Sequence, residues 1–336
     1  MLNIIIPYYN DKENLRKALF SLCAQTNKKF ITTIVDDNSD EDIKDLIEEF
    51  KELTIIYIRN EENLGPGLSR QKGIDLAYKR NFEYIIFLDS DDILYPRAID
   101  LLSHEARINN ADVVYTPIQV EEAAGGSHLI QLDNCTTWTH GKIYKTSFLK
   151  DNNISFHEKI KYNEDSYFNL LISLLAKRKF KVNEPVYLWR NNKNSLTRKN
   201  REDFIKISNK DYIYGQCEVI QQLLYRNQIT EDKYESIVLT IINIYYKWQL
   251  QELFYKNTNF FYSEEFTTLF LKIINILKNK KILEILRNKK ILKYIVRNCH
   301  VGEEVNGKIY FYPENFLEWI NSFGVKELIS YEHLYN

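Results

Sequence analysis

The sequence predicts an α/β domain over residues 1–199 and a mainly α-helical domain over residues 200–336. In the first part, short apolar runs alternate with segments of helical spacing, and apolar strands separated by helices form a sheet that helices cover on both faces. After about Lys199 the chain has long helical stretches with few Gly or Pro residues. We place the expected domain boundary at this change in composition and pattern.

The elements of the first domain follow from periodicity and from turn residues. The first strand is the β-branched run 3–6, which we expect to end at Pro7 because proline has no N–H for a strand ladder. Leu15, Leu19 and Leu22 share one helical face. The other expected strands are 30–35, 55–58, 84–88, 113–115 and 182–189. The other expected helices are 43–50, 65–78, one from Pro96, 142–148 and 163–177, and residues 117–141 read as a loop or hairpin.

Composition narrows the class of protein. Hydrophobic residues make up 44% and charged residues 27% of the 336 residues, as in soluble globular proteins. The formal net charge of −1 gives no global attraction to nucleic acid or membranes. The apolar run 2–6 is too short for a signal peptide, and no apolar run is long enough to span a membrane. The cysteines have no metal-ligand or redox spacing, which favours a cytoplasmic protein: Cys23, Cys135, Cys217 and Cys299.

Polar residues follow three of the expected strands, at residues 7–10, 36–39 and 89–92. The carboxyl ends of parallel strands meet at one edge of a sheet, and ligands of such sheets bind beyond that edge. The sequence therefore predicts that three segments deliver polar groups to one site.

The run Asp89-Ser90-Asp91-Asp92 is the strongest candidate for a metal site. Carboxylate oxygens suit Mg²⁺ or Mn²⁺, whose coordination spheres usually keep room for substrate phosphates. The alternative is that these aspartates form a turn and cap the helix that begins near Pro96.

A nucleotide site is the second candidate. Asp37 ends a strand, where a carboxylate can bind a base or ribose, and Tyr8 and Tyr9 lie at the neighbouring strand end, where a ring can stack. The glycines of residues 63–70 open a helix, whose N-terminus favours anions. Arg70 in this segment either bridges a diphosphate to the acidic run or is a surface residue of the helix.

Asn163-Glu164-Asp165 begins a later helix. Asn163 is a good N-cap and acids suit the first turn, so a purely structural role is one interpretation. The other is that Asp165 acts as a general base on an acceptor hydroxyl, with Glu164 as the next candidate. The six histidines have no ligand spacing; we expect a structural role for His140 and His157 rather than a place at the acceptor side.

Taken together, the motifs resemble family 2 glycosyltransferases, which have the GT-A fold. The matching pieces occur in family order over roughly the first 200 residues: Ile4–Asn10, Val35–Ser39, Asn63–Gly65 with Ser69-Arg70, Phe87–Asp92, Gly141–Tyr144, Glu164-Asp165 and Ser195–Arg198. The resemblance implies a Rossmann-like mixed sheet and transfer of a sugar, expected to be a hexose, from a UDP-sugar with inversion. It implies nothing about residues 200–336.

The resemblance also assigns roles. Pro7, Tyr9 and Asp37 would hold the uracil, with Arg70 at the nucleotide. Asp89 would meet the ribose, Asp91 together with Asp89 would bind Mn²⁺ or Mg²⁺, and Asp165 would be the base. Ser195–Arg198, after Trp189-Arg190, falls where the family closes a loop over the diphosphate. The remaining residues of the expected donor site are Asn63, Ser90 and Arg198.

Three other classes of protein would place different demands on the sequence. A phosphoryl-transfer enzyme would use an Asp-x-Asp pair, but at its first strand, whereas here the pair follows about the fourth. A non-catalytic nucleotide-sugar-binding protein would not need Asp91 or Asp165. A pyrophosphorylase would need a Gly-rich, Arg-containing loop where Tyr8-Tyr9-Asn10 stands.

The acceptor stays open among an anionic polymer, a glycan, a lipid carrier, a protein and a modified nucleic acid. The second domain is expected to bind the acceptor or to mediate oligomerisation. A stretch rich in basic residues, from Lys272 to Arg297, is either a solvated helical face or a surface for an anionic acceptor or a membrane.

Overall fold

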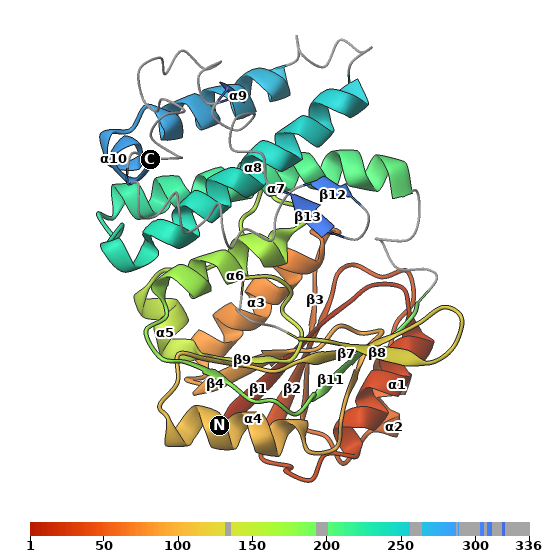
Figure 1. Cartoon of the computed structure of the whole chain (residues 1–336). Coiled ribbons are helices and arrows are strands. Elements are labelled where there is room, and N and C mark those ends of the chain that lie inside the picture. The colour runs from red at the N-terminus through yellow and green to blue at the C-terminus, as the bar shows by residue number, and fades with distance from the viewer. Residues whose placement is uncertain are drawn as a thin grey trace. The chain divides into compact units, whose positions relative to one another are not determined.

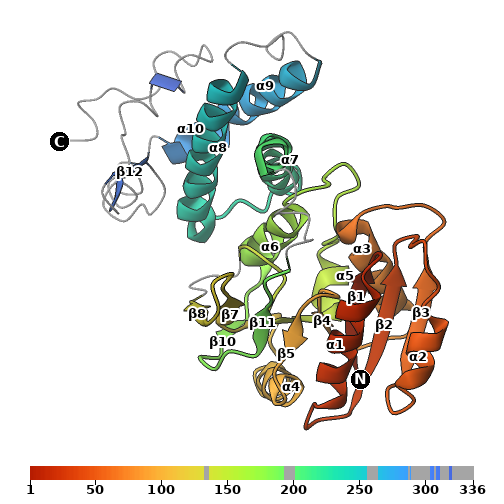
Figure 2. The same cartoon turned by 90° about the vertical axis from the view of Figure 1, so that its right-hand side faces the viewer.

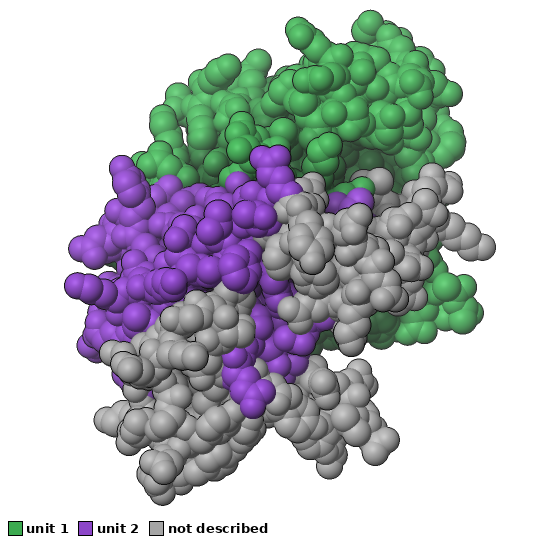
Figure 3. Space-filling model, turned by 90° about the horizontal axis from the view of Figure 1, so that it is seen from above, with its two compact units in different colours: residues 1–199 green, residues 200–336 purple. Residues whose placement is uncertain are grey.

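The computed structural model describes residues 1–131, 136–192, 201–255, 264–286, 288, 303–305, 308–310 and 318–319. The chain forms two compact units, Met1–Lys199 and Asn200–Asn336, which are coloured separately in Figure 3. The first is a mixed α/β unit and the described part of the second is mainly helical, which confirms the predicted fold class.

A seven-stranded sheet forms the centre of the first unit, in the order β10-β6-β9-β4-β1-β2-β3 (Figure 1). Its pairs are parallel except where β9 runs antiparallel to both β4 and β6, so the sheet is mixed. The strands are β1 (Leu2–Tyr8), β2 (Phe30–Asp36), β3 (Ile55–Arg59), β4 (Tyr84–Phe87), β6 (Val113–Tyr115), β9 (Lys142–Lys145) and β10 (Lys179–Lys181).

Helices cover both faces of this sheet (Figures 1 and 2). They are α1 (Lys12–Cys23), α2 (Lys44–Glu49), α3 (Pro66–Lys79), α4 (Ala98–Ile108), α5 (Thr146–Asp151) and α6 (Glu164–Leu175). Ile4 and Ile6 of β1 share one buried cluster with Leu19 of α1 and Leu102 of α4. Ile5 faces the opposite way, toward Gly73 of α3, where an added Cβ would lie 2.4 Å from Ile5 Cγ2. This close approach brings α3, and with it Arg70, against the sheet.

The first strand does not end at Pro7, as the sequence predicted, but continues to Tyr8. The Ile5 carbonyl accepts from Leu88 N–H on the β4 side, and the Tyr8 carbonyl accepts from Asp37 N–H on the β2 side. Pro7 therefore faces the β4 side, where pairing has already ended at Phe87. A proline is tolerated there because no ladder hydrogen bond is lost.

Two other expectations about the elements are wrong. Residues 142–145 form strand β9 instead of the start of a helix, because Ile143 and Tyr144 are buried on the two faces of the sheet. Of the expected strand 182–189, only Tyr187–Trp189 is a strand, β11, which joins a second sheet; β10 lies just before this range and joins the large sheet. The second sheet has the order β5-β11-β7-β8 and includes β5 (Ile93–Leu94), and its β7 (Ile118–Glu121) and β8 (Ser127–Ile130) are the expected hairpin.

The second unit contains α7 (Arg201–Tyr225), the 3₁₀ turn Glu231–Lys233, α8 (Tyr234–Tyr255), α9 (Glu264–Leu277), α10 (Lys280–Leu286) and the strand pair β12 (Glu303–Val305) and β13 (Lys308–Tyr310). Its helices pack through buried aliphatic residues such as Ile220, Ile241 and Ile273. Among the described helices of the chain, none is long and apolar enough to cross a membrane.

Two lysines in the described part of the predicted basic stretch are paired with acids. Lys272 is mostly buried and pairs with Glu218 of α7, and Lys281 pairs with Glu284 3.3 Å away. Arg287 and the basic residues after it lie outside the described part of the chain.

Candidate active site

The carboxyl ends of β1, β2 and β4 are neighbours in the sheet, so the three polar segments share one edge as the sequence predicted. The first two segments are joined directly. Asn10 N–H donates to Ser39 Oγ over 3.0 Å, and the Asn10 side chain both donates to and accepts from Asp40. Asn10 and Asn38 have positive φ angles of 48° and 64°, which asparagine tolerates better than most residues.

Asp37 closes the loop that precedes α3. Its buried carboxylate accepts from Asn60 Nδ2 at 2.7 Å, from Leu64 N–H at 2.9 Å and from Gly65 N–H at 2.7 Å. These bonds fix the glycine-rich segment before the helix. Asp37 therefore has a structural task in addition to the predicted contact with uracil, which stays a prediction.

The other residues expected around the base differ in exposure. Pro7 is buried within β1, whereas Tyr9 is 49% exposed and Asn63 is exposed in the loop before α3. Ser90 is half-buried in the turn after β4. Arg198 and the rest of the expected closing loop, residues 195–198, lie outside the described residues.

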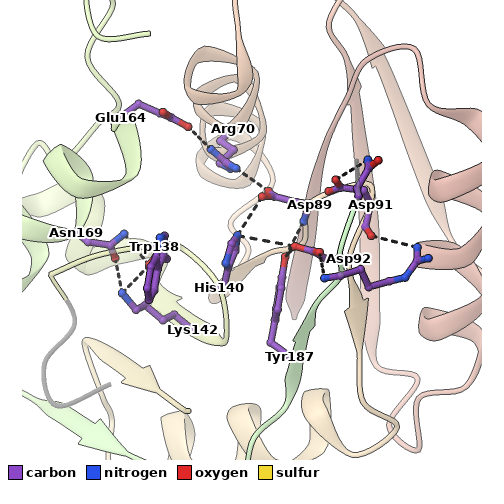
Figure 4. A network of polar contacts seen from close by, with 12 residues as sticks. Arg70, Asp89, Asp91, Asp92, Trp138, His140, Lys142, Glu164, Asn169 and Tyr187 are labelled. Atoms are coloured by element: carbon purple, nitrogen blue, oxygen red, sulfur yellow. Dashed lines mark hydrogen bonds and ion pairs between the residues drawn. The ribbon is translucent and has the colours of Figure 1, made fainter. Parts of the chain in front are cut away.

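Arg70 joins two acidic segments. Its Nη2 lies 2.6 Å from Asp89 Oδ1, and its Nη1 lies 2.8 Å from Glu164 Oε1 (Figure 4). The Arg70 side chain is only 5% exposed, so the alternative of a surface helix residue is wrong. Its guanidinium carbon also lies 5.9 Å from the centre of the Phe156 ring. The arginine thus connects the end of β4 to the first turn of α6.

The charges in this group are strongly coupled. Burial raises the pKa of Glu164 to about 7, with a further contribution from the Asp165 carboxylate and an opposing one from Arg70. Burial would also raise the pKa of Asp89, but Arg70 and His140 outweigh it and hold that pKa below its usual range. Glu164 is consequently a less suitable base than a free carboxylate, since it is engaged by a buried cation.

His140 lies inside the acidic cluster, and the structural role expected for it stays a prediction. Its Nε2 is 3.1 Å from Asp89 Oδ2 and 3.9 Å from Asp92 Oδ2, and its ring stacks on Tyr187 with centroids 4.7 Å apart. One donor atom from each of Asp89, Asp92 and His140 lies within 4.8 Å of the others. His140 follows Asp89 by 51 residues, so no local spacing connects the two.

Asp92 ties strand β11 to the acidic turn. Its Oδ2 accepts from the Tyr187 hydroxyl at 2.7 Å, and its Oδ1 accepts from Arg190 N–H at 2.8 Å. Burial raises the pKa of Asp92 to about 7, against the lowering effect of His140. Both oxygens already accept hydrogen bonds, so Asp92 acts as a structural anchor here.

Asp91 is the most available carboxylate of the run. Its Oδ2 accepts from Asn192 Nδ2 at 2.9 Å, and among the described residues this is its one side-chain partner. Burial and the nearby Asp89 charge raise the pKa of Asp91. An oxygen-rich, acidic set of this kind fits a hard divalent cation.

Asp165 lies in the first turn of α6 and is half-exposed. Its Oδ1 accepts from Ser166 N–H at 2.7 Å. Asn163 stands at the expected N-cap position of α6 with a left-handed φ of 57°, but its side chain makes no capping hydrogen bond to this helix. The acid that faces solvent in this turn is Asp165, whereas Glu164 points to Arg70 (Figure 4).

Solved structures identify the fold. The chain is similar to Staphylococcus aureus TarS 1–349 in complex with UDP-GlcNAc, with a TM-score of 0.60 and 19% identity over 88% of this chain and 84% of that one. It is also similar to a mannosyltransferase of Pyrobaculum calidifontis in complex with GDP-Man and Mn²⁺, with a TM-score of 0.52 and 11% identity over 96% and 84% of the two chains. The mixed sheet and its flanking helices therefore define an α/β protein of the GT-A type.

Sequence comparison gives the family. Residues 3–158 match the model described as Glycosyl transferase family 2. A poly(ribitol-phosphate) beta-glucosyltransferase of Bacillus spizizenii is 29% identical over 193 residues, which are 53% of this chain and 30% of that protein. The chain thus spans about a third of the length of this relative. The N-terminal unit therefore matches glycosyltransferase family 2 over residues 3–158, as its motifs predicted.

Proposed function

We propose that this protein transfers a sugar, most simply a hexose, from a UDP-sugar to an acceptor hydroxyl with inversion at the anomeric carbon. The observation that carries the proposal is the Arg70 bridge. It joins Asp89, at the end of β4, to Glu164, which precedes Asp165 in α6. The buried Arg70 thereby connects the acidic turn at Asp89, which is suited to a nucleotide and a metal ion, with the helical turn of Asp165, which is suited to remove a proton.

Asp165 is the proposed general base. It lies in the first turn of α6 and is partly exposed, as a carboxylate that takes a proton from an acceptor hydroxyl must be. The acceptor oxygen attacks the anomeric carbon as its proton passes to Asp165, and the bond from that carbon to the diphosphate breaks on the opposite face. Direct displacement of this kind inverts the configuration, as it does in inverting glycosidases with water in place of the acceptor.

Asp91, with Asp89 beside it, is proposed to hold a divalent cation, Mn²⁺ or Mg²⁺. A bound cation would stabilise the negative charge that develops on the departing diphosphate. The carboxylates that lie near Asp91 support this assignment, and so does the Mn²⁺ that accompanies GDP-Man in the similar mannosyltransferase structure. Asp89, Asp92 and His140 are an alternative ligand set, but both oxygens of Asp92 already accept hydrogen bonds.

The donor site is proposed at the ends of β1 and β2. Tyr9 offers an exposed ring for stacking on uracil beside Pro7, and Asp37 and Asn63 lie at the loop that precedes α3. Ser90 and Arg198 are further proposed donor contacts. A UDP-sugar is preferred because the similar structure of TarS holds UDP-GlcNAc.

The acceptor we propose to test first is a poly(ribitol phosphate), the polymer named for the related glucosyltransferase of Bacillus spizizenii. The second unit is proposed to bind the acceptor or to join copies of the chain. Glycans, lipid carriers, proteins and modified nucleic acids are the acceptors to test next.

A donor screen tests the proposal. The full chain is mixed with Mn²⁺ and single UDP- or GDP-sugars, and thermal shift identifies the nucleotide sugar that stabilises it. Released UDP is then measured with each acceptor, and modified acceptors are identified by mass spectrometry. Stabilisation by a UDP-sugar without release of UDP under any condition would favour the second candidate, a binding protein without transferase activity.

A further inference from the structure

Lys142 is a buried charged residue for which the proposed mechanism has no use. It belongs to β9 in the middle of the sheet, and its side chain is completely buried. Its ammonium group donates to the Thr137 carbonyl, to the Trp138 carbonyl at 2.6 Å and to Asn169 Oδ1 at 3.1 Å (Figure 4). Burying an ammonium group is costly unless it is well hydrogen-bonded, so we ask what these hydrogen bonds hold in place.

Asn169 of α6 completes the network. Its Oδ1 accepts from Lys142 and, at 2.9 Å, from the Tyr144 hydroxyl. Its Nδ2 donates to the Trp138 carbonyl at 3.0 Å and to the Asp165 carbonyl at 2.9 Å. All four hydrogen-bonding positions of this amide are therefore in use. One side chain thus joins the turn at Trp138 to the helical turn that carries Asp165.

The turn held by these two residues has an unfavourable backbone. Trp138 has a φ of 33°, which a bulky residue adopts only when its surroundings impose it. Its carbonyl accepts from both Lys142 and Asn169, and these two donors fix the peptide in that orientation. Gly141, with a φ of 63°, ends the turn and is held through its carbonyl by Thr116 N–H at 3.0 Å.

The turn carries side chains into the candidate active site. His140 lies against Asp89, and Trp138 and His140 pack on Trp189 with ring centroids 5.6 and 5.4 Å away. Asp89 in turn pairs with Arg70. Any shift of the turn would therefore move His140 relative to the acidic cluster.

We propose that Lys142 and Asn169 are positioning residues that hold the Trp138–Gly141 turn, and with it His140, in register with Asp89 and with the first turn of α6. The effect on turnover rests on the proposed transferase function. Neither residue needs to touch the substrate. A displacement of about 1 Å at reacting groups can cost about 100-fold in rate, which is the loss expected when the turn is released.

Two variants and one control test this proposal. Lys142→Met keeps the length of the side chain and removes its donors. Asn169→Asp keeps an acceptor for Lys142 but replaces the donors to the Trp138 and Asp165 carbonyls with a repelling oxygen, and the new ion pair to Lys142 helps the variant to fold. Tyr144→Phe is the control, because it removes a buried hydrogen bond to the same Asn169 oxygen without touching the turn.

Turnover, donor KM and the ring NMR signals of labelled histidine are measured for each folded variant, with His140→Gln used to assign the His140 signal. We expect both test variants to lose kcat by about 100-fold with little change in donor KM, and to move the His140 signal. Tyr144→Phe should keep kcat and the His140 signal near those of the wild type.

A purely structural role for Lys142 and Asn169 predicts a different result. The test variants would then melt earlier, as Tyr144→Phe does, with kcat and the His140 signal unchanged, and the proposal would be wrong. If the wild-type protein transferred no sugar, the proposed function would fail. The His140 signal would still decide whether Lys142 and Asn169 hold the turn.

Discussion

Replacing Arg70 with methionine should destabilise the first unit more than the loss of any surface ion pair. Arg70 contacts Asp89 at 2.6 Å and Glu164 at 2.8 Å. The side chain of Arg70 is 5% exposed, that of Asp89 25% and that of Glu164 11%. Removal of the cation leaves two carboxylates close together with little water. Breaking a buried ion pair from one side costs about 3–5 kcal/mol.

Part of this cost comes from Glu164 alone. Burial already raises its pKa to about 7 while Arg70 is present, so without the arginine the carboxyl group should take up a proton at neutral pH. The double variant Arg70→Met with Glu164→Gln puts a neutral amide in place of a carboxyl group that must take up a proton on folding, and it should recover part of the lost stability. The remainder reflects Asp89, which keeps its contact with His140.

Hydrogen exchange in the full chain measures this loss for the first unit separately. Protection of amides in β1 and β4 reports the free energy of its unfolding, since core strands open only in the largest unfolding event. A loss of about 3–5 kcal/mol lowers protection by about two to nearly four orders of magnitude. The matched control is Arg107→Met, which removes an exposed pair with Glu83 at 3.2 Å and should cost no more than about 1 kcal/mol.

The reasoning would be refuted if Arg70→Met and Arg107→Met lowered protection equally. A double variant that is less stable than Arg70→Met alone would also contradict it, since the buried carboxyl group of Glu164 would then not be the cause.

Three further predictions concern single carboxylates. Chelation or Asp91→Asn should abolish most transfer, and Asn192→Ala should tighten Mn²⁺ binding in calorimetry because Asn192 donates to Asp91 Oδ2; full activity in excess chelator would rule out the metal. Asp165→Asn should lower turnover by about 100- to 10,000-fold with UDP affinity unchanged, whereas a capping role alone predicts a loss of about 1 kcal/mol in stability and normal turnover. Burial would raise the pKa of Asp112, but its bonds to Arg178 and to Lys177 N–H lower it below the usual value, so its contribution is present above about pH 4 and lost as the pH falls further. Asp112→Asn should therefore cost about 1.5–3 kcal/mol at pH 7 and progressively less in acid, and an equal cost at both extremes would contradict this assignment.

Local patterns in the sequence predicted most of the first unit. Apolar β-branched runs gave the parallel strands, and the residues after those strands gave the shared polar edge. Strand β9 was missed because lysines stand at both of its ends, and a buried lysine such as Lys142 carries no signal of its partners. The sequence predicts a strand end at Pro7 because it does not show that β1 has already stopped pairing with β4 on the side that Pro7 faces.

The candidate site was predicted as single residues and not as a network. Asp89, Arg70 and Glu164 were named separately, but their joint ion pairs span 94 residues of sequence and depend on the packing of α3 against the sheet. His140, Tyr187 and Asn192 were not assigned to the site, since each approaches the acidic run from a distant segment. Paired spacing can reveal ligands on one helix or turn, but not groups that only the fold brings together.

Proton NMR of an α-linked UDP-sugar during turnover tests the central claim most directly. The full chain is incubated with Mn²⁺ and poly(ribitol phosphate), with water as the remaining acceptor, and the anomeric signals are followed as UDP appears. Inverting transfer predicts that a β-anomeric product forms first, at a rate that Asp165→Asn lowers by about 100- to 10,000-fold. An α-anomeric first product, or a rate that Asp165→Asn leaves unchanged, would contradict it.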